Sequence, residues 1–250
     1  MSIPAKISLN HLAKAFGPNK VLRDVSLEVE TGKSLVVIGG SGTGKSVLLK
    51  CILGIVTPDA GDILVDGKPL NRVDFLHDFG MLFQGGALFD SLPVWHNIAF
   101  RQRQGKNRLS KKQAQELAIE KLRRVGLKPE TAFQHPAELS GGMQKRVGLA
   151  RAIATDPAVI FFDEPTTGLD PIMAGVINEL IREIVVEMGA TSITITHDMS
   201  SVRAIADKVA MLHDGKIRWH GDVTDIDHSG DPYLDQFIHG RADGPIEGVR

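Results

Sequence analysis

The chain has 250 residues, one cysteine, and 29 Lys and Arg residues against 30 Asp and Glu residues, so its net charge is −1. This length suits one α/β domain with an inserted lobe better than two independent domains. The charge balance gives no sign of a nucleic-acid surface, and we expect no nucleic-acid partner. A single cysteine excludes an internal disulfide, and no apolar run reaches the roughly 18 residues that a membrane helix needs. The N-terminal residues contain no apolar secretory core, so we expect a protein that is soluble or held on a membrane by partners.

The first part of the chain has the texture of antiparallel strands. Apolar and polar residues alternate over residues 7–12 and 25–29, with a turn at Gly17-Pro18-Asn19 between them. A further short strand is predicted at residues 61–65, closed by the turn Asp66-Gly67. These segments predict a small antiparallel subdomain at the start of the chain.

An eight-residue glycine-rich stretch then fits the phosphate-loop pattern G-x-x-x-x-G-K-[ST]. An apolar run at residues 35–38 predicts a buried strand before it, and residues 47–53 predict a helix after it. The glycines let backbone N–H groups turn toward phosphate oxygens, Lys45 reaches the β and γ phosphates, and the Ser46 hydroxyl can bind Mg²⁺. A chance match in an ordinary glycine-rich turn is the alternative. The predicted nucleotide-binding residues of the loop are Gly39, Gly40, Ser41, Gly42, Thr43, Gly44, Lys45 and Ser46.

Residues 87–157 change from strand-like to helical texture and predict a helical lobe inserted into the core. Ser110 and Gln113 can form a capping box, and Gly126 can end the helix that follows. Two later apolar runs suit central parallel strands that deliver polar groups at their carboxyl ends: residues 158–162 before Asp163-Glu164, and residues 192–196 before His197. The last residues are poor in helix and strand formers, so we expect one domain at 1–240 and a tail at 241–250, frayed or docked on a partner.

One further motif selects among the nucleotide-binding families. The run Leu139-Ser140-Gly141-Gly142-Met143-Gln144-Lys145-Arg146 resembles the ABC-family signature and precedes residues 159–164 by the short spacing of that family. With Gln84, the turn at 168–170 and His197, the resemblance covers nearly the whole chain in family order. It implies an α/β fold with a P-loop NTPase core, an antiparallel β subdomain and an inserted helical subdomain. It also implies an ATPase that uses ATP and Mg²⁺, and it disfavours a simple kinase or GTPase.

In the ABC family the signature of one subunit covers the γ-phosphate held by the phosphate loop of a second copy. The residues themselves agree, because a hydroxyl and the first N–H groups of a helix form an anion site. An ordinary helix cap is the alternative. Met143 departs from the commonest family sequence, which has Gln there. The residues that the resemblance assigns to this site in trans are Ser140, Gly141, Gly142, Met143 and Gln144.

Two carboxylates end the apolar run at 158–162. Asp163 is expected to hold Mg²⁺ through water, and Glu164 to orient and partly deprotonate the attacking water. The alternative is that both acids cap the next turn, although two carboxylates at the end of a buried strand are costly without a cation. With Ser46 and Gln84, Asp163 completes the predicted metal ligands.

Family position suggests four more roles. His197 would contact the γ-phosphate and support catalysis with Glu164, Gln84 would report the γ-phosphate to a partner, and Phe16 would stack on adenine. Asp170 would reach across the dimer interface. The corresponding alternatives are a structural histidine, a core phenylalanine in a hairpin, and a plain turn before the helix that begins at about Pro171.

The segment Phe79–Leu92 and the tail resemble the Mla-type phospholipid-transport ATPases, which are related to toluene-tolerance and chloroplast lipid-import ATPases. The resemblance implies a peripheral ATPase on the cytoplasmic face of the inner membrane. Its partners would be a second copy, an MlaE-like permease, an MCE-domain substrate protein and a small STAS-domain subunit. The alternatives are the ATPase of a polar-solute importer, such as an amino-acid system, and a soluble non-transport ABC ATPase.

Overall fold

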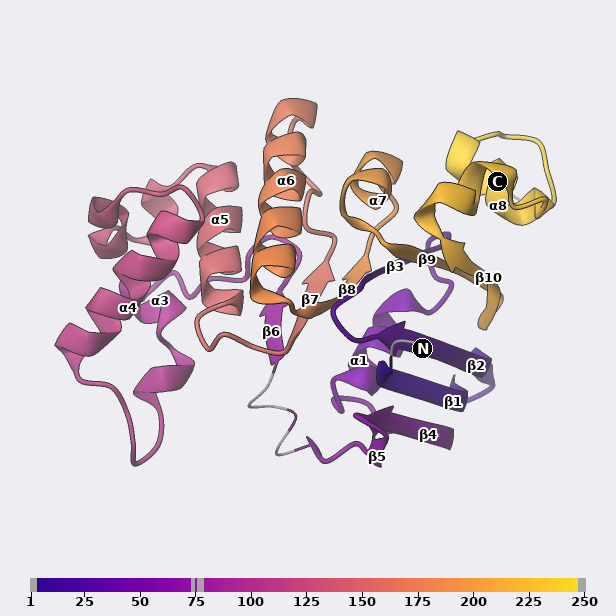
Figure 1. Cartoon of the computed structure of the whole chain (residues 1–250), viewed down its shortest axis with the longest axis horizontal. Coiled ribbons are helices and arrows are strands. Elements are labelled where there is room, and N and C mark those ends of the chain that lie inside the picture. The colour runs from indigo at the N-terminus through magenta and orange to yellow at the C-terminus, as the bar shows by residue number, and fades with distance from the viewer. Residues whose placement is uncertain (1–3, 73–74, 76–78, 247–250) are drawn as a thin grey trace. The chain divides into compact units, whose positions relative to one another are not determined.

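The antiparallel subdomain begins with two long paired strands, β1 (Ala5–Phe16) and β2 (Asn19–Glu30). Their alternating residues bury one face, as the sequence predicts. The other edge of β1 pairs antiparallel with β4 (Ala60–Val65), which pairs with β5 (Lys68–Pro69). The computed structural model describes residues 4–72, 75 and 79–246 (Figure 1).

The strand before the phosphate loop is β3 (Ser34–Ile38), and all of its residues are buried. It runs parallel to β9 (Lys208–His213), which pairs antiparallel with β10 (Lys216–Asp222). Helix α1 (Lys45–Ile52) follows the loop, and the buried Cys51 lies on it, as expected for a packed small side chain. In this part of the sheet the strand order is β5-β4-β1-β2-β10-β9-β3. The remaining elements here are α7 (Met199–Ile205), the 3₁₀ helix η4 (Val223–His228) and α8 (Pro232–His239).

The middle of the chain combines two parallel strands with helices. Strand β6 (Phe79–Leu82) pairs parallel with β7 (Val159–Asp163), which ends at the acidic pair. Between them come α3 (Val94–Ile98), α4 (Lys111–Arg124) and α5 (Gly141–Ala152), with short 3₁₀ turns at Arg101–Arg103, Pro129–Phe133 and Pro136–Glu138. The predicted capping box at Ser110 and Gln113 is present at the start of α4, and Gly126 takes φ +70° just after its end. Helix α6 (Pro171–Met188) and strand β8 (Thr191–Ile195) follow β7.

Contacts between Cα atoms divide the chain into two compact units, residues 1–76 with 193–250 and residues 77–192. Strand β8 carries the chain from the second unit back into the first. The predicted helical lobe, residues 87–157, lies within the second unit, and its boundaries stay a prediction. Within the described residues, no helix combines the length and the apolar character that crossing a membrane requires.

Candidate nucleotide site

The phosphate loop connects β3 to α1 through backbone that favours glycine at two positions. Gly42 and Gly44 have φ values of +76° and +104°, and Gly44 caps α1 without a side-chain bond. The Lys45 ammonium lies back over the loop, donating to the Gly39 and Gly40 carbonyls at 2.7 and 2.8 Å. The first N–H groups of α1 have no carbonyl of the helix to bind, so they and the Lys45 ammonium can donate hydrogen bonds to phosphate oxygens.

The start of the loop is fixed by close approach to β9. A Cβ atom on Gly39 would overlap the Leu212 carbonyl, so no larger residue fits at this position. The Thr43 hydroxyl donates to the Gly40 carbonyl at 2.9 Å and closes the loop on itself. These two contacts fix the path of the loop backbone.

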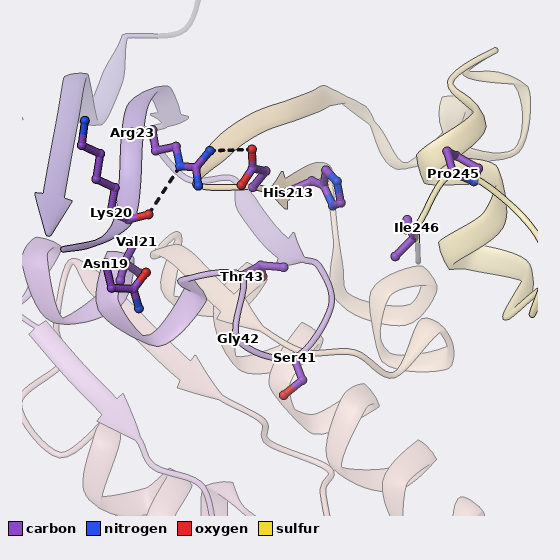
Figure 2. A pocket seen from close by; sticks show the side chains of 12 residues that line it. Asn19, Lys20, Val21, Arg23, Ser41, Gly42, Thr43, His213, Pro245 and Ile246 are labelled. Carbon is purple, nitrogen blue, oxygen red and sulfur yellow. Dashed lines mark hydrogen bonds and ion pairs between the residues drawn. The ribbon is translucent and has the colours of Figure 1, made fainter. Parts of the chain in front are cut away.

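A cavity of about 460 Å³ lies against the middle of the phosphate loop (Figure 2). Ser41, Gly42 and Thr43 form one side of it, and residues 19–21 at the start of β2 form another. Its polar lining includes Arg23, whose guanidinium donates to the Asp214 carboxylate at 2.7 Å. This volume lies within the roughly 300–1,000 Å³ range of small-molecule sites, so the cavity can hold part of a nucleotide.

Two predicted nucleotide contacts also belong to the first unit. Phe16 ends β1 with 50% of its surface exposed, and the Lys14 ammonium lies 5.4 Å from its ring centre. Because the ring is outside the core, the alternative of a packed core phenylalanine is excluded. His197 is exposed just after β8, next to Asp198, which caps α7 by accepting from the Ser200 N–H at 3.0 Å. The contacts of Phe16 and His197 with a nucleotide stay predictions.

The acidic pair ends β7 in the second unit, and both side chains are half-buried. Glu164 has φ +47°, a left-handed conformation that is uncommon for a residue with a side chain. Its carboxylate accepts from the Thr167 hydroxyl at 3.1 Å. The pair thus stands at a sharp, strained turn of the chain, a kind of geometry that often accompanies functional residues.

A buried lysine lies beneath this turn. The Lys145 side chain is on α5, the residue is only 4% exposed, and its ammonium donates to the Glu164 carbonyl at 3.3 Å. Burial lowers the pKa of Lys145, and the nearby negative charges of Asp163 and Glu164 oppose that shift. Sequence reasoning assigned no role to Lys145, because a lysine on a helix is usually solvent-exposed. The one clue to the burial of Lys145 was its position on the side of the signature helix that packs against the core.

Helix α5 carries the signature and is capped by Ser140, whose hydroxyl accepts from the Met143 N–H at 3.3 Å. Accepting this bond leaves the exposed hydroxyl its own hydrogen to donate to a ligand. Gly142 packs against the tip of Met173 on α6, and Met143 lines a separate cavity. The Gln144 amide donates to the Pro136 and Leu139 carbonyls at 3.0 and 3.3 Å, so it supports the turn before the helix.

The other end of α5 holds the loop that follows Gln84. Arg151 donates to the Ala87 and Gly86 carbonyls, each at 2.7 Å, and lies 5.8 Å from the Phe83 ring centre. Burial lowers the pKa of this guanidinium. Gln84 itself is exposed. The signature helix and the Gln84 loop are therefore joined directly, through an arginine that sequence reasoning did not single out.

The same loop continues into a turn organised by Asn97, a fully buried residue of α3. Its side chain accepts from the Phe89 N–H at 2.7 Å and donates to the Phe89 and Leu92 carbonyls at 3.1 and 2.9 Å. Phe83 and Phe89 remain 41% and 45% exposed. The distinctive segment Phe79–Leu92 thus begins as strand β6 and continues as an ordered turn, with two exposed aromatic rings at Phe83 and Phe89.

Asp170 caps α6, where its carboxylate accepts from the Ile172 and Met173 N–H groups, both at 3.0 Å. Pro171 occupies the first turn of the helix, as predicted. The cap accounts for Asp170 locally, and its role at a dimer interface stays a prediction.

The described residues contain no group of three or more His, Cys, Asp or Glu side chains able to hold a metal ion. The predicted Mg²⁺ ligands are a hydroxyl, an amide and one carboxylate, and Mg²⁺ usually takes the rest of its ligands from phosphates and water. Ser46 lies in the first unit and Gln84 and Asp163 lie in the second, so their joint site stays a prediction.

Comparison with known families decides which class of phosphate-loop protein this is. Residues 22–167 match the model of the ABC transporter family. The chain belongs to that family. Its α/β fold with a P-loop NTPase core and its ATPase activity, both predicted from the signature, are confirmed by this match and by its structural relatives.

Relatives of this ABC ATPase extend over nearly its whole length. The Haemophilus influenzae intermembrane phospholipid transport system ATP-binding protein MlaF is 39% identical over 96% of this chain and 92% of its own. The chloroplastic protein TRIGALACTOSYLDIACYLGLYCEROL 3 of Arabidopsis thaliana is 38% identical over 96% of this chain and 75% of its own. A probable ribonucleotide transport ATP-binding protein, mkl of Mycobacterium leprae, is 37% identical over 98% of this chain and 72% of its own. The predicted resemblance to the Mla type is thus confirmed.

Solved structures agree. The ATP-binding cassette MJ0796, a dimer bound to ADP and Pi, has a TM-score of 0.77 and 27% identity over 87% of this chain and 98% of its own. CbiO1 of Clostridium perfringens, part of the transporter complex cbiONQ, has a TM-score of 0.80 and 27% identity over 89% of this chain and 90% of its own. As a member of the ABC family, this ATPase therefore binds ATP.

Proposed function

We propose that this chain is the ATP-hydrolysing subunit of a transporter that moves phospholipid between the inner and outer membranes of a bacterium. The observation that carries this proposal is the similarity to the MlaF proteins of Haemophilus influenzae and Escherichia coli, which extends over 92% and 93% of those chains. The rival assignment to an amino-acid importer has no comparable support. The chain would act at the cytoplasmic face of the inner membrane, as a peripheral subunit.

The ATP site is shared between two copies in this proposal. Gly39–Ser46 of one copy holds the phosphates, and Ser140 to Gln144 of the other covers the γ-phosphate. The exposed Ser140 hydroxyl and the first N–H groups of α5 supply donors suited to an anion. The predicted reach of Asp170 across the interface belongs to the same arrangement.

Hydrolysis in this site depends on positioning and charge. Ser46, Gln84 and Asp163 would hold Mg²⁺, which neutralises developing phosphate charge when bound. Glu164 would orient the attacking water, and His197 would contact the γ-phosphate. Lys145 and Thr167 support the Glu164 turn through the contacts given above.

Coupling to transport would run through the loop after Gln84. Phe83, just before Gln84, and Phe89, in the ordered turn of this loop, are both exposed, which suits contact with an MlaE-like permease. An MCE-domain substrate protein and a small STAS-domain subunit complete the proposed assembly.

The test combines paired inactive variants in a strain that lacks the chromosomal gene. Lys45→Ala removes the phosphate-loop cation, and Ser140→Arg blocks the signature. In a shared site, a pair made of one of each keeps one intact site: the Ser140→Arg copy's own phosphate loop with the Lys45→Ala copy's signature. Co-expression should therefore restore both ATP turnover of the purified assembly and the normal phospholipid content of the outer membrane.

The matched control is Lys45→Ala with Glu164→Gln. Both changes act on the phosphate-loop side of a site, so neither site of the mixed pair is intact and no rescue is expected. Equal rescue in the two mixtures would contradict the shared site. A deletion strain with unchanged membrane phospholipids and lost uptake of a polar solute would contradict the lipid assignment.

A further inference from the structure

The chain after α8 folds back on that helix as a defined turn, residues 241–246, which we call the C-terminal turn. Gln236 fastens it. This side chain is 6% exposed and donates to the Arg241 and Ile246 carbonyls at 3.2 and 3.1 Å, while its carbonyl oxygen accepts from the Ile246 N–H at 2.7 Å. A buried amide with three such bonds holds the backbone of the turn much as a strand partner would.

Two more contacts fix the path of the C-terminal turn. The Arg241 guanidinium donates to the Asp235 carboxylate at 2.7 Å, which ties the start of the turn to α8. Gly244 passes so close to Gln236 that a Cβ atom there would overlap the glutamine amide. The turn is thus built for close contact with the helix, and residues 241–246 are not a frayed end.

Helix α8 is in turn held by the hairpin of β9 and β10. The Tyr233 ring contacts His213, at 4.8 Å between ring centres, and the Arg218 guanidinium, at 4.3 Å from the ring centre. Arg218 also donates to Asp231, the cap of α8, at 2.8 Å. His213 also lines the cavity at the phosphate loop. The contacts of His213 with α8, and of α8 with the C-terminal turn, therefore hold that turn beside the same cavity.

The C-terminal turn closes one side of that cavity. Pro245 and Ile246 line it, opposite the start of β2 and beside Ser41–Thr43 of the phosphate loop (Figure 2). Both side chains are apolar, so they suit a purine or ribose face better than phosphate, which the loop itself receives. We propose that the C-terminal turn is a wall of this chain's own nucleotide site, and that Ile246 contacts the nucleoside part of the bound nucleotide.

This inference rests on the proposed function, because it requires that the phosphate loop holds ATP and ADP. It goes beyond that function by adding residues 245 and 246 to the site and by giving Gln236 the part of a positioning residue. An Ile246 contact of about 40 Å² would strengthen binding by about fivefold.

The experiment measures binding of ADP and of pyrophosphate to the purified full chain by calorimetry. The variants are Ile246→Ser and a chain that ends after Gly240; the control is a chain that ends after Ile246. We expect both variants to bind ADP about fivefold more weakly while their pyrophosphate affinity stays within twofold of the full chain. The control chain should match the full chain for both ligands.

Two outcomes would overturn the proposal. One is ADP affinity that stays within twofold in both variants. The other is a parallel loss of ADP and pyrophosphate affinity, which would mean that the turn shapes the phosphate loop without touching the nucleoside. Lys45→Ala separates this failure from failure of the proposed function. If Lys45→Ala binds ADP and pyrophosphate as the full chain does, the phosphate-loop assignment itself is wrong.

Discussion

Arg151→Met should lower the free energy of unfolding by about 2 kcal/mol, because it removes the hydrogen bonds between α5 and the Gln84 loop. The wild-type guanidinium makes two short bonds, to the Gly86 and Ala87 carbonyls at 2.7 Å each. Bonds from a charged donor contribute about 1.5 kcal/mol or more each, so their loss costs about 3 kcal/mol. Methionine avoids burying a charge and recovers about 1 kcal/mol of that cost.

The assay is urea denaturation of the full chain, followed by far-ultraviolet circular dichroism. Arg146→Met is the matched control: it lies on the same helix, and its single nitrogen reaches the Val125 and Gly126 carbonyls at 3.2 and 3.4 Å. We expect the control to lose less than about 1 kcal/mol. Hydrogen exchange at Gly86 and Ala87 should rise in Arg151→Met and not in Arg146→Met. Equal destabilisation by the two substitutions would refute the reasoning.

Two further predictions concern burial and close packing. Burial lowers the pKa of His220 below its ordinary value of 6.5, so the unfolded chain binds more protons there, and stability should fall as pH drops through 6.5. His220→Gln should flatten that slope in urea titrations at several pH values; an unchanged slope would contradict the assignment. Gly80→Ala should cost at least about 2 kcal/mol, because its Cβ would overlap the Ala152 carbonyl. Gly175→Ala, on the open face of α6, should not destabilise, and similar losses in both would show that the overlap is relieved cheaply.

The fold was predictable where one local signal was strong. The apolar run at residues 35–38 and the glycines after it marked the strand and loop, and Ser110 with Gln113 marked the start of α4. Each of these depends on neighbours in sequence, which is what pattern reasoning measures. The order β5-β4-β1-β2-β10-β9-β3 was out of reach, because β10 joins β2 across a long stretch of chain.

The residues that family motifs mark could be predicted from the sequence, whereas the buried residues that hold them in place could not. Glu164 and Ser140 were found because family motifs mark them, but nothing in the sequence marks the left-handed backbone of Glu164. Lys145 and Gln236 hold neighbouring backbone from buried positions on helices. Because lysine and glutamine are mostly exposed in proteins, the sequence suggests ordinary surface residues at both positions. Such residues are recognised only after the fold brings their partners close to them.

Helix α5 combines an exposed end with a close-fitting one. At Ser140 it meets solvent, whereas farther along α5 a Cβ atom on Gly80 would overlap the Ala152 carbonyl and one on Gly148 would overlap the Leu82 side chain. Close-packed surfaces of this kind have no slack to absorb a small displacement. We therefore expect a displacement of a fraction of an ångström at the Ser140 end to be passed along α5 to the Gln84 loop rather than absorbed within the helix.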